Sequence, residues 1–354
     1  MNEVIKEIIQ ETEAARKPTD SVPWEADKPS TQPLYTYKPS TQSWEPTSSQ
    51  PSSTLSSSST IKNLALFSWN IDFMLPHGQS RMASALSELE AQLAKLPPTT
   101  AAVVFLQECT PSDLDVVGEN GWVRAAFART DVGAEFWGNA AYGTTTLVDR
   151  RLAVGEVFRV HYSLTRMERD ALFVDVVFPG EKDGVEKKKK KGDERGKQRI
   201  IRFCNTHLES LVQEPAYRPP QAALAAKFMH DEGVHGALLA GDLNAIQPFD
   251  RSLHSANDLH DAYLSLGGAE DSEEGYTWGQ QAAPELRRLF GCSRMDKVWY
   301  CGGVMVRKFE RFGADVEVKD EKEKEEIRSW GGFDFEKAWI TDHLGVWAIV
   351  DVVD

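Results

Sequence analysis

The chain has 354 residues with 40 Lys plus Arg and 54 Asp plus Glu, which gives a formal net charge of −14 at pH 7. This balance excludes a uniformly basic nucleic-acid coat, because phosphate binding by counterion release needs a dense Lys/Arg surface. The hydrophobic share of 41% is large enough for a sizeable core.

Two further observations indicate a soluble intracellular protein. No apolar run approaches the roughly 18 residues of a membrane helix, and residues 1–17 are too charged for a signal peptide. The four cysteines, at positions 109, 204, 292 and 301, show no CxxC spacing. We therefore expect reduced thiols and no membrane contact.

The first 60 residues differ in composition from the rest. Over residues 28–60, Pro, Ser and Thr fill 22 of 33 positions, so this segment has little apolar surface to offset its chain entropy. We expect residues 1–60 to form a disordered arm. Its aromatic residues Trp24, Tyr35, Tyr37 and Trp44 would either pack on the folded part or bind a partner, which the sequence does not identify.

Residues 61–354 predict one folded domain in which short β-rich runs outnumber helical patterns. Helices are expected over residues 82–96, 219–231 and 257–266. Strands are expected over residues 63–69, 101–106, 142–148, 152–160, 170–178, 200–208, 236–241, 295–301, 304–312 and 344–353. Many strands with few helices between them predict two sheets packed face to face with helices outside.

Two charged insertions interrupt this pattern, near residues 180–198 and 317–328. The first lies between two predicted strands and is most simply a solvated hairpin loop. Its lysine run at 187–191 also fits a nuclear-import signal. The second mixes both signs of charge and predicts a surface excursion.

Polar residues stand where the apolar strands end. Asn70 ends SWN, Glu108 ends FLQE, His207 lies in THLES, Asp242 and Asn244 end GDLN, and Asp342 and His343 precede the last strand. Side chains at such positions can converge on one cleft. Each residue alone is typical of a cap or a surface charge, whereas the whole set is hard to explain that way.

This residue set favours a particular chemistry. One Glu with neighbouring Asn and Asp oxygens suits Mg²⁺, with Mn²⁺ as a possible substitute. The histidines show no zinc-like spacing, and neither a GxxxxGK[ST] loop nor a GxSxG elbow is present. Metal-assisted displacement at phosphorus remains.

The ordered motifs SWN, LQE, THLES, GDLN, RMDK and TDH resemble the endonuclease/exonuclease/phosphatase superfamily. WNID, FLQECTP and YTW at Tyr276 to Trp278 are most similar to its tyrosyl-DNA phosphodiesterase 2 branch. The resemblance covers residues 61–354. It implies a four-layer α/β sandwich of two packed mixed sheets between helices, with the site at one edge of the sheets.

The resemblance also implies roles for the strand-end residues. Glu108 would be the main Mg²⁺ ligand, with Asn70 near the metal and Asp342 as a further contact. Asp242 would orient or deprotonate the attacking water, and Asn244 would hold the water or a phosphate oxygen. His343, oriented by Asp296, would stabilise the transition state, and His207 would donate to another phosphate oxygen.

Four further residues are candidate substrate contacts. Trp278 is either a base-stacking residue or an ordinary core or rim tryptophan. Arg169 precedes a strand and would reach phosphate or form a salt bridge, and Tyr142 would touch phosphate or pack in the core. Arg218 would line the path of DNA.

The function implied is a Mg²⁺-dependent phosphodiesterase that removes tyrosyl adducts, such as those of topoisomerase 2, from single-stranded 5′ DNA ends. We expect a monomer that acts in DNA repair in the nucleus, with the cytoplasm as a further compartment. Two departures leave the substrate open, since no arginine follows GDLN and Gly279 stands where the branch tends to have aspartate.

Two alternatives stay open. One is another phosphodiesterase of the superfamily, namely an apurinic/apyrimidinic endonuclease, an RNA deadenylase or a phosphoinositide phosphatase. The other is a catalytically inactive binding module.

Overall fold

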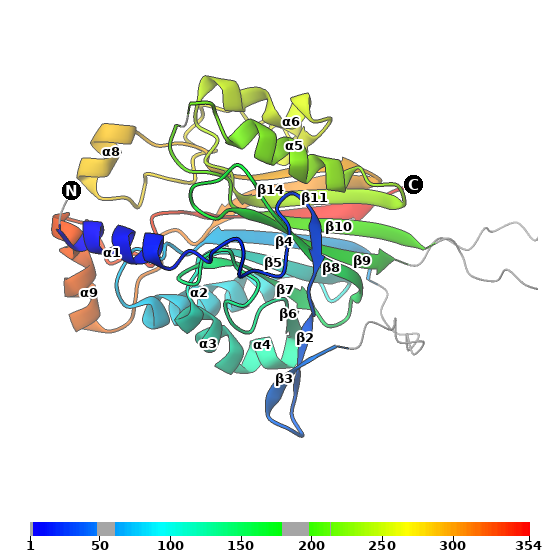
Figure 1. The fold of residues 1–354 in the computed structure, drawn as a ribbon, viewed down its shortest axis with the longest axis horizontal. Helices are drawn as coiled ribbons and strands as arrows, with labels where there is room; N and C mark the ends of the chain where they lie inside the picture. Colours follow the sequence, from blue (N-terminus) through cyan, green and yellow to red (C-terminus); the bar gives the residue numbers. More distant parts are fainter. Residues whose placement is uncertain (1–2, 48–60, 179–197, 213) are drawn as a thin grey trace, which may run out of the picture.

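Two mixed β-sheets, packed face to face, form the centre of the computed structural model (Figure 1), which describes residues 3–47, 61–178, 198–212 and 214–354. The strands of the first sheet follow the order β1 (Pro29–Thr31), β8 (Ala153–His161), β9 (Asp170–Phe178), β10 (Arg199–Thr206), β11 (Val234–Asp242), β13 (Asp296–Gly302), β12 (His260–Asp261). The strands of the second follow the order β14 (Val304–Phe312), β15 (Gly345–Val352), β4 (Asn63–Asn70), β5 (Thr100–Cys109), β7 (Gly143–Asp149), β6 (Phe127–Arg129), β2 (Tyr35–Lys38), β3 (Ser43–Pro46).

Each sheet contains one parallel pair at its centre, and these pairs place the site. Strands β10 and β11 run parallel in the first sheet, and β4 and β5 run parallel in the second. The carboxyl ends of parallel neighbours meet at the same sheet edge. Residues that follow these four strands can therefore share one cleft.

Helices cover the outer face of each sheet, which completes the four layers (Figure 1). The α-helices are α1 (Glu3–Ala14), α2 (Gly78–Leu93), α3 (Pro111–Glu119), α4 (Gly121–Ala126), α5 (Arg218–Met229), α6 (Leu253–Ala256), α7 (Ala262–Ser265), α8 (Pro284–Phe290) and α9 (Glu321–Arg328). Two 3₁₀ turns cover Pro248–Ser252 and Trp330–Gly332.

Three apolar clusters hold the layers together. Between the sheets, Phe105 of β5 meets Phe203 of β10 edge to face, with ring centroids 6.3 Å apart. Outside the second sheet, α2 buries Met82, Leu86 and Leu89 at helical spacing. Outside the first sheet, α5 buries Ala222, Ala225 and Met229. The predicted two-sheet sandwich is confirmed.

The N-terminal segment differs from the disorder expected of residues 1–60. Strand β1 pairs with β8 and forms the edge of the first sheet, and the β2–β3 hairpin extends the second sheet through β6. The Tyr35 side chain is buried, and Trp44 donates its indole N–H to the Gly118 carbonyl at 3.0 Å. Strand pairing and the burial of Leu34 and Tyr35 hold this segment on the domain, although Ile9 of α1 is exposed. Residues 48–60 lie outside the described residues.

One other predicted element is also corrected. In place of one helix over 257–266, the chain forms β12 and then α7, whose N-cap is Asp261. The carboxylate of Asp261 accepts the backbone N–H groups of Tyr263 and Leu264, so the helix starts five residues later than expected. The surface excursion expected near 317–328 contains α9, which Asp320 caps. The insertion near 180–198 lies almost wholly outside the described residues.

Among the helices that the structure describes, none is both long enough and apolar enough to cross a membrane.

The buried position of Tyr35 can be tested by its removal. We expect Tyr35→Ala to lower the free energy of unfolding by about 3 kcal/mol, the usual cost of emptying a buried aromatic site. Urea denaturation measures the change. Lys38→Ala, at an exposed position of the same strand, should change it by less than about 0.5 kcal/mol. Equal, negligible effects of both substitutions would show that β2 is not packed on the domain.

Candidate active site

One carboxylate oxygen lies at the centre of the site. Asp242, at the end of β11, places Oδ2 3.0 Å from the Asn70 amide nitrogen, 3.3 Å from His207 Nε2 and 3.6 Å from His343 Nε2. Its other oxygen accepts the backbone N–H of Asn244 at 2.9 Å. Burial alone would raise the pKa of Asp242, but His343 and His207 outweigh burial and hold it well below its usual range. Asp242 is therefore ionised at neutral pH.

His343 forms a buried ion pair with Asp296, the first residue of β13. Its Nδ1 lies 2.8 Å from Asp296 Oδ2, while Nε2 points toward Asp242. Burial opposes a charged imidazole, but the carboxylates of Asp296, Asp242 and Asp342 together raise the pKa of His343 well above its usual value. The predicted contact between Asp296 and His343 is present, and it favours the imidazolium form.

His207 is held from the opposite side by an arginine. The Arg169 guanidinium, which can only donate, places Nη1 2.8 Å from His207 Nδ1. Nδ1 therefore accepts, and the ring hydrogen lies on Nε2, which faces Asp242 Oδ2. The Asn244 amide nitrogen lies 3.0 Å from the same Nε2 and 3.2 Å from the Leu208 carbonyl. Arg169 therefore lies at the site, as expected, but it contacts a histidine and forms no salt bridge within the described residues.

Close approach of the backbone brings these groups together. Gly241 has φ of +152°, and a Cβ at this position would lie 1.7 Å from the Thr206 carbonyl oxygen. Only glycine lets β11 pass β10 at this point. The consequence is that His207, one residue after Thr206, lies beside Asp242.

A second group of carboxylates lies next to Asp242. The register of β5 against β7 shifts between Leu106 and Cys109, and Glu108 has φ of +57°, an uncommon conformation for glutamate. This irregularity turns Glu108 out of the sheet, and its Oε2 accepts the Phe73 N–H at 3.2 Å. Sheet periodicity alone could not predict that turn.

Asp72 completes this group and is the residue that our sequence analysis missed. Burial raises its pKa to about 8, with contributions from Asp342 and Glu108, although Arg81 opposes the shift. The motif WNID contains Asp72, but the residue follows the strand end by two positions. Its φ of +56° marks the tight turn that brings it back to the cleft.

The residues present fit a hard divalent cation. Burial raises the pKa of Asp72 and of Asp342, and the neighbouring Glu108 carboxylate adds to both shifts. Within the described ranges, none of the three pairs with a lysine or arginine. Asn70 adds an amide oxygen, which accepts the Asp72 N–H at 2.9 Å. Oxygen donors of this kind are the ligands of Mg²⁺ and similar ions.

A different cluster also has metal-like spacing, with ligand atoms of Asp242, Asp296 and His343 within 4.8 Å of one another. Its imidazole is already paired with Asp296 through Nδ1, and protonated His343 would supply the positive charge that these two carboxylates need. The carboxylate group around Glu108 is therefore the better fit for a cation.

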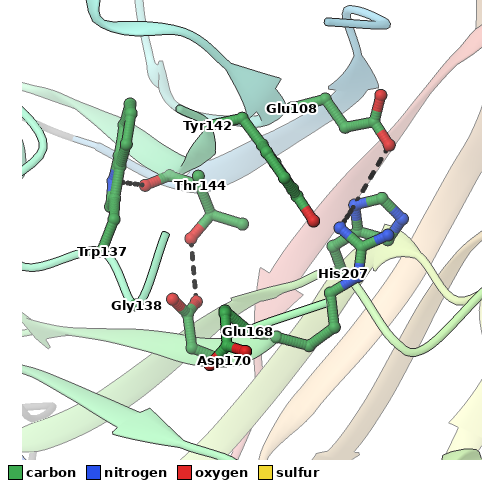
Figure 2. Close-up of a pocket in the computed structure, with 10 residues that line it drawn as sticks. Glu108, Trp137, Gly138, Tyr142, Thr144, Glu168, Asp170 and His207 are labelled. Carbon is green, nitrogen blue, oxygen red and sulfur yellow. Dashed lines mark hydrogen bonds and ion pairs between the residues drawn. The ribbon is translucent and has the colours of Figure 1, made fainter. Parts of the chain in front are cut away.

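Tyr142 lies in a pocket shared with Glu108 and His207. Figure 2 shows Glu108 and His207 facing each other at one end, with the Tyr142 ring beside them. The ring stacks on Phe73 with centroids 4.3 Å apart, and its hydroxyl donates to the Met167 carbonyl at 2.9 Å. Tyr142 is therefore both packed and adjacent to the site.

Trp278 holds a carboxylate of the site. Its indole N–H donates to Asp342 Oδ2 at 2.6 Å, and the side chain is buried with Ala282 and Met295. Trp278 therefore does not form an exposed platform on which a nucleobase could stack. The rim or core alternative is the correct one, with an added role in orienting Asp342.

Arg218 does not line a path for DNA. The side chain is buried, and its Nε and Nη2 donate to the Asp250 carboxylate at 2.7 to 3.1 Å. Its Nη1 donates to the carbonyls of Glu209 and Leu211. The sequence could not distinguish this buried ion pair from a surface arginine.

The fold and the site together define a hydrolase of phosphoric ester bonds. An ionised aspartate, the His343 imidazolium and the His207 ring converge beside a carboxylate group fit for a cation. Residues 67–343 match the Endonuclease/Exonuclease/phosphatase family, and the chain belongs to it. This family generally uses a divalent metal ion. No curated protein sequence matches the chain.

Several solved structures share the fold. *Danio rerio* TDP2 complexed with single strand DNA product has 18% identity and a TM-score of 0.55, with 82% of this chain and 99% of that chain covered. Truncated *Caenorhabditis elegans* TDP2 has 19% identity and a TM-score of 0.54, with the same shares covered. The human Nocturnin catalytic domain with bound sulfate has 16% identity and a TM-score of 0.51, with 82% and 95% covered. At these identities, the structural similarity shows a common fold alone.

The ion pair of His343 and Asp296 gives a testable pH dependence. In Asp296→Asn we expect the pKa of His343 to fall, because the nearest carboxylate is lost while burial remains. The raised pKa means that the pair stabilises the folded state fully below pH 6.5, the ordinary histidine value, and loses this contribution as the pH rises through the folded-state pKa. The variant should therefore lose more stability at pH 6 than above that pKa.

Imidazole NMR titration and urea denaturation at both pH values measure these effects. Asp20→Asn, at an exposed position, is the control and should change neither. An unaltered His343 titration in Asp296→Asn would contradict the assignment.

Proposed function

We propose that the protein is a Mg²⁺-dependent phosphodiesterase that hydrolyses 5′-phosphotyrosyl bonds at DNA ends, such as topoisomerase 2 adducts. The observation that carries this proposal is the convergence of Asn70, His207 and His343 on Asp242 Oδ2 beside the Glu108 carboxylate group. Mg²⁺ would neutralise the phosphate charge and polarise the scissile bond, and Mn²⁺ would be a substitute. Glu108, Asp72, Asn70 and Asp342 would hold it.

Asp242 would hold the attacking water. Because its pKa is depressed, the Asp242 carboxylate stays ionised and is a weak base. Its main contribution would therefore be to orient the water as a hydrogen-bond acceptor. Asn244, whose backbone N–H is fixed by Asp242, would place its side chain on the water or on a phosphate oxygen.

The two histidines would bind the phosphate in different ways. His343 as an imidazolium offers a charged donor at Nε2, where negative charge develops in the transition state. His207 would offer the Nε2 hydrogen, because the Arg169 guanidinium donates to Nδ1.

The chemistry of the leaving group supports a tyrosyl substrate. A phenol has a pKa of about 10, so a phenolate departs with less help from a general acid than a sugar alkoxide. TDP2 of *Danio rerio* has been crystallised with a single strand DNA product, and by analogy a single-stranded 5′ end is the DNA partner that we propose. A role in DNA repair, and with it a nuclear location, belongs to the same proposal.

The main alternative keeps the site and changes the phosphodiester. It is favoured by the sequence GDLNAIQ, in which no arginine follows the motif, and by the match to the Nocturnin domain. Assays with 5′-tyrosyl oligonucleotide, abasic duplex, polyadenylate and inositol polyphosphate separate the candidates. Release of tyrosine from the first substrate alone would support our proposal, and its absence would overturn it.

Removal of the principal metal ligand should abolish turnover. In Glu108→Gln we expect the rate of tyrosine release to fall by at least about 10²-fold, because a bound metal supplies several kcal/mol of transition-state stabilisation. EDTA should have a similar effect on the unaltered protein. Glu90→Gln, on the exposed face of α2, should retain full activity. Undiminished activity in EDTA would contradict the metal requirement.

The indole N–H of Trp278 can be tested apart from its ring. Trp278→Phe keeps an aromatic side chain but loses the hydrogen bond to Asp342. If Trp278 orients a metal-site carboxylate, the Mg²⁺ concentration for half-maximal rate should rise about 10-fold or more. Trp330→Phe removes an indole hydrogen bond to the Met74 carbonyl and serves as the matched control. An unchanged Mg²⁺ requirement in Trp278→Phe would contradict this role.

A further inference from the structure

A second cleft lies beside the catalytic pocket, and the N-terminal segment forms one of its walls. Its volume is about 360 Å³. Lys17, Trp24 and Glu25 line it from the N-terminal side, and His161 and Arg169 line it from the domain. The two cavities share Gly138, Glu168 and Arg169, so the cleft adjoins the pocket that contains Glu108 and His207.

The N-terminal wall is fixed to the domain. Lys17 donates its backbone N–H to the Gly138 carbonyl at 3.0 Å, and Asp27 donates to the His161 carbonyl at 2.7 Å. The Asp27 carboxylate in turn accepts the Ser163 N–H at 2.8 Å. Trp24 stacks on His161 with centroids 4.0 Å apart and rings 13° from parallel. The cleft is therefore preformed, which lowers the cost of binding.

The cleft is poorly suited to nucleic acid. Lys17 and Arg169 are balanced by Glu25 and Glu168, so the wall has no excess positive charge for phosphates. Trp24 offers little free ring face for a base, because His161 stacks on it and Lys17 Nζ lies over it at 5.6 Å from the centroid.

The wall keeps unused hydrogen-bonding capacity. His161 Nε2 and Arg169 Nε are buried and have no hydrogen-bond partner among the described residues. Burial lowers the pKa of His161 to about 4, so the ring is neutral and offers one donor and one acceptor. Balanced charges with both kinds of hydrogen-bonding group match the amides and mixed side chains of a polypeptide.

We infer that this cleft binds the polypeptide that flanks the tyrosine of the adduct. The inference rests on the proposed function, because only a protein-linked DNA end brings a peptide to the site. The peptide must leave the scissile phosphate by a route separate from DNA. The cleft provides such a route, since it begins at Arg169, which contacts His207.

The test compares two substrates that differ only on the peptide side. One oligonucleotide has a single tyrosine at its 5′ phosphate, and the other has the same tyrosine within a short peptide. We expect kcat/KM to be about tenfold higher for the peptide substrate, the effect of one or two added hydrogen bonds. Ala26→Trp would place a large side chain at the exposed lining position 26 and should remove this preference without changing cleavage of the tyrosyl substrate. Ala26→Ser is the matched control and should keep the preference.

The outcomes separate this inference from the function on which it rests. No tyrosine release from either substrate would overturn both. Cleavage of both substrates with equal kcat/KM, unaffected by Ala26→Trp, would overturn the role of the cleft and leave the proposed function standing. A preference that Ala26→Trp abolishes and Ala26→Ser retains would support the cleft as the peptide site.

Discussion

The site depends on one buried carboxylate oxygen that several donors share. Asp242 Oδ2 faces Asn70 from β4, His207 from the end of β10 and His343 from the turn before β15. A buried carboxylate without such partners would be strongly destabilising. The contacts that stabilise the buried Asp242 carboxylate also join the two sheets at the cleft. The arrangement of charge that suits catalysis is therefore also a structural link between the layers.

The sequence predicted the parts of this arrangement that follow from strand periodicity. All ten predicted strands are present, whereas the short strands β1, β2, β3, β6 and β12 were not predicted. The residues at the strand ends converge because the central pairs β4–β5 and β10–β11 are parallel. What periodicity could not supply is backbone geometry. The register shift that turns Glu108 outward, the turn that returns Asp72 and the close approach at Gly241 each depend on a neighbouring strand.

The substrate contacts that the structure does not show have a common cause. Residue type suggested Arg218 as a cation for DNA and left Trp278 between a stacking platform and a core or rim tryptophan. Each side chain is instead hydrogen-bonded to an acidic partner, Asp250 and Asp342 respectively. The N-terminal segment was misjudged for a related reason, since its composition suggests disorder while a few aromatic residues decide its packing. Composition reflects the average properties of a segment, whereas its packing depends on individual contacts with the domain.

Part of the net charge of −14 can be related to particular residues of the site. Part of the acidity is concentrated where Glu108, Asp72 and Asp342 oppose one another, and burial makes this repulsion stronger than it would be in water. A divalent cation would relieve the repulsion and offset most of the local negative charge, which would prepare the cleft for phosphate. Beyond Arg169, the balanced wall of the second cleft repels neither charge. The two sides of the site therefore differ in what they can accept, and that difference is the physical basis for assigning phosphate to one and polypeptide to the other.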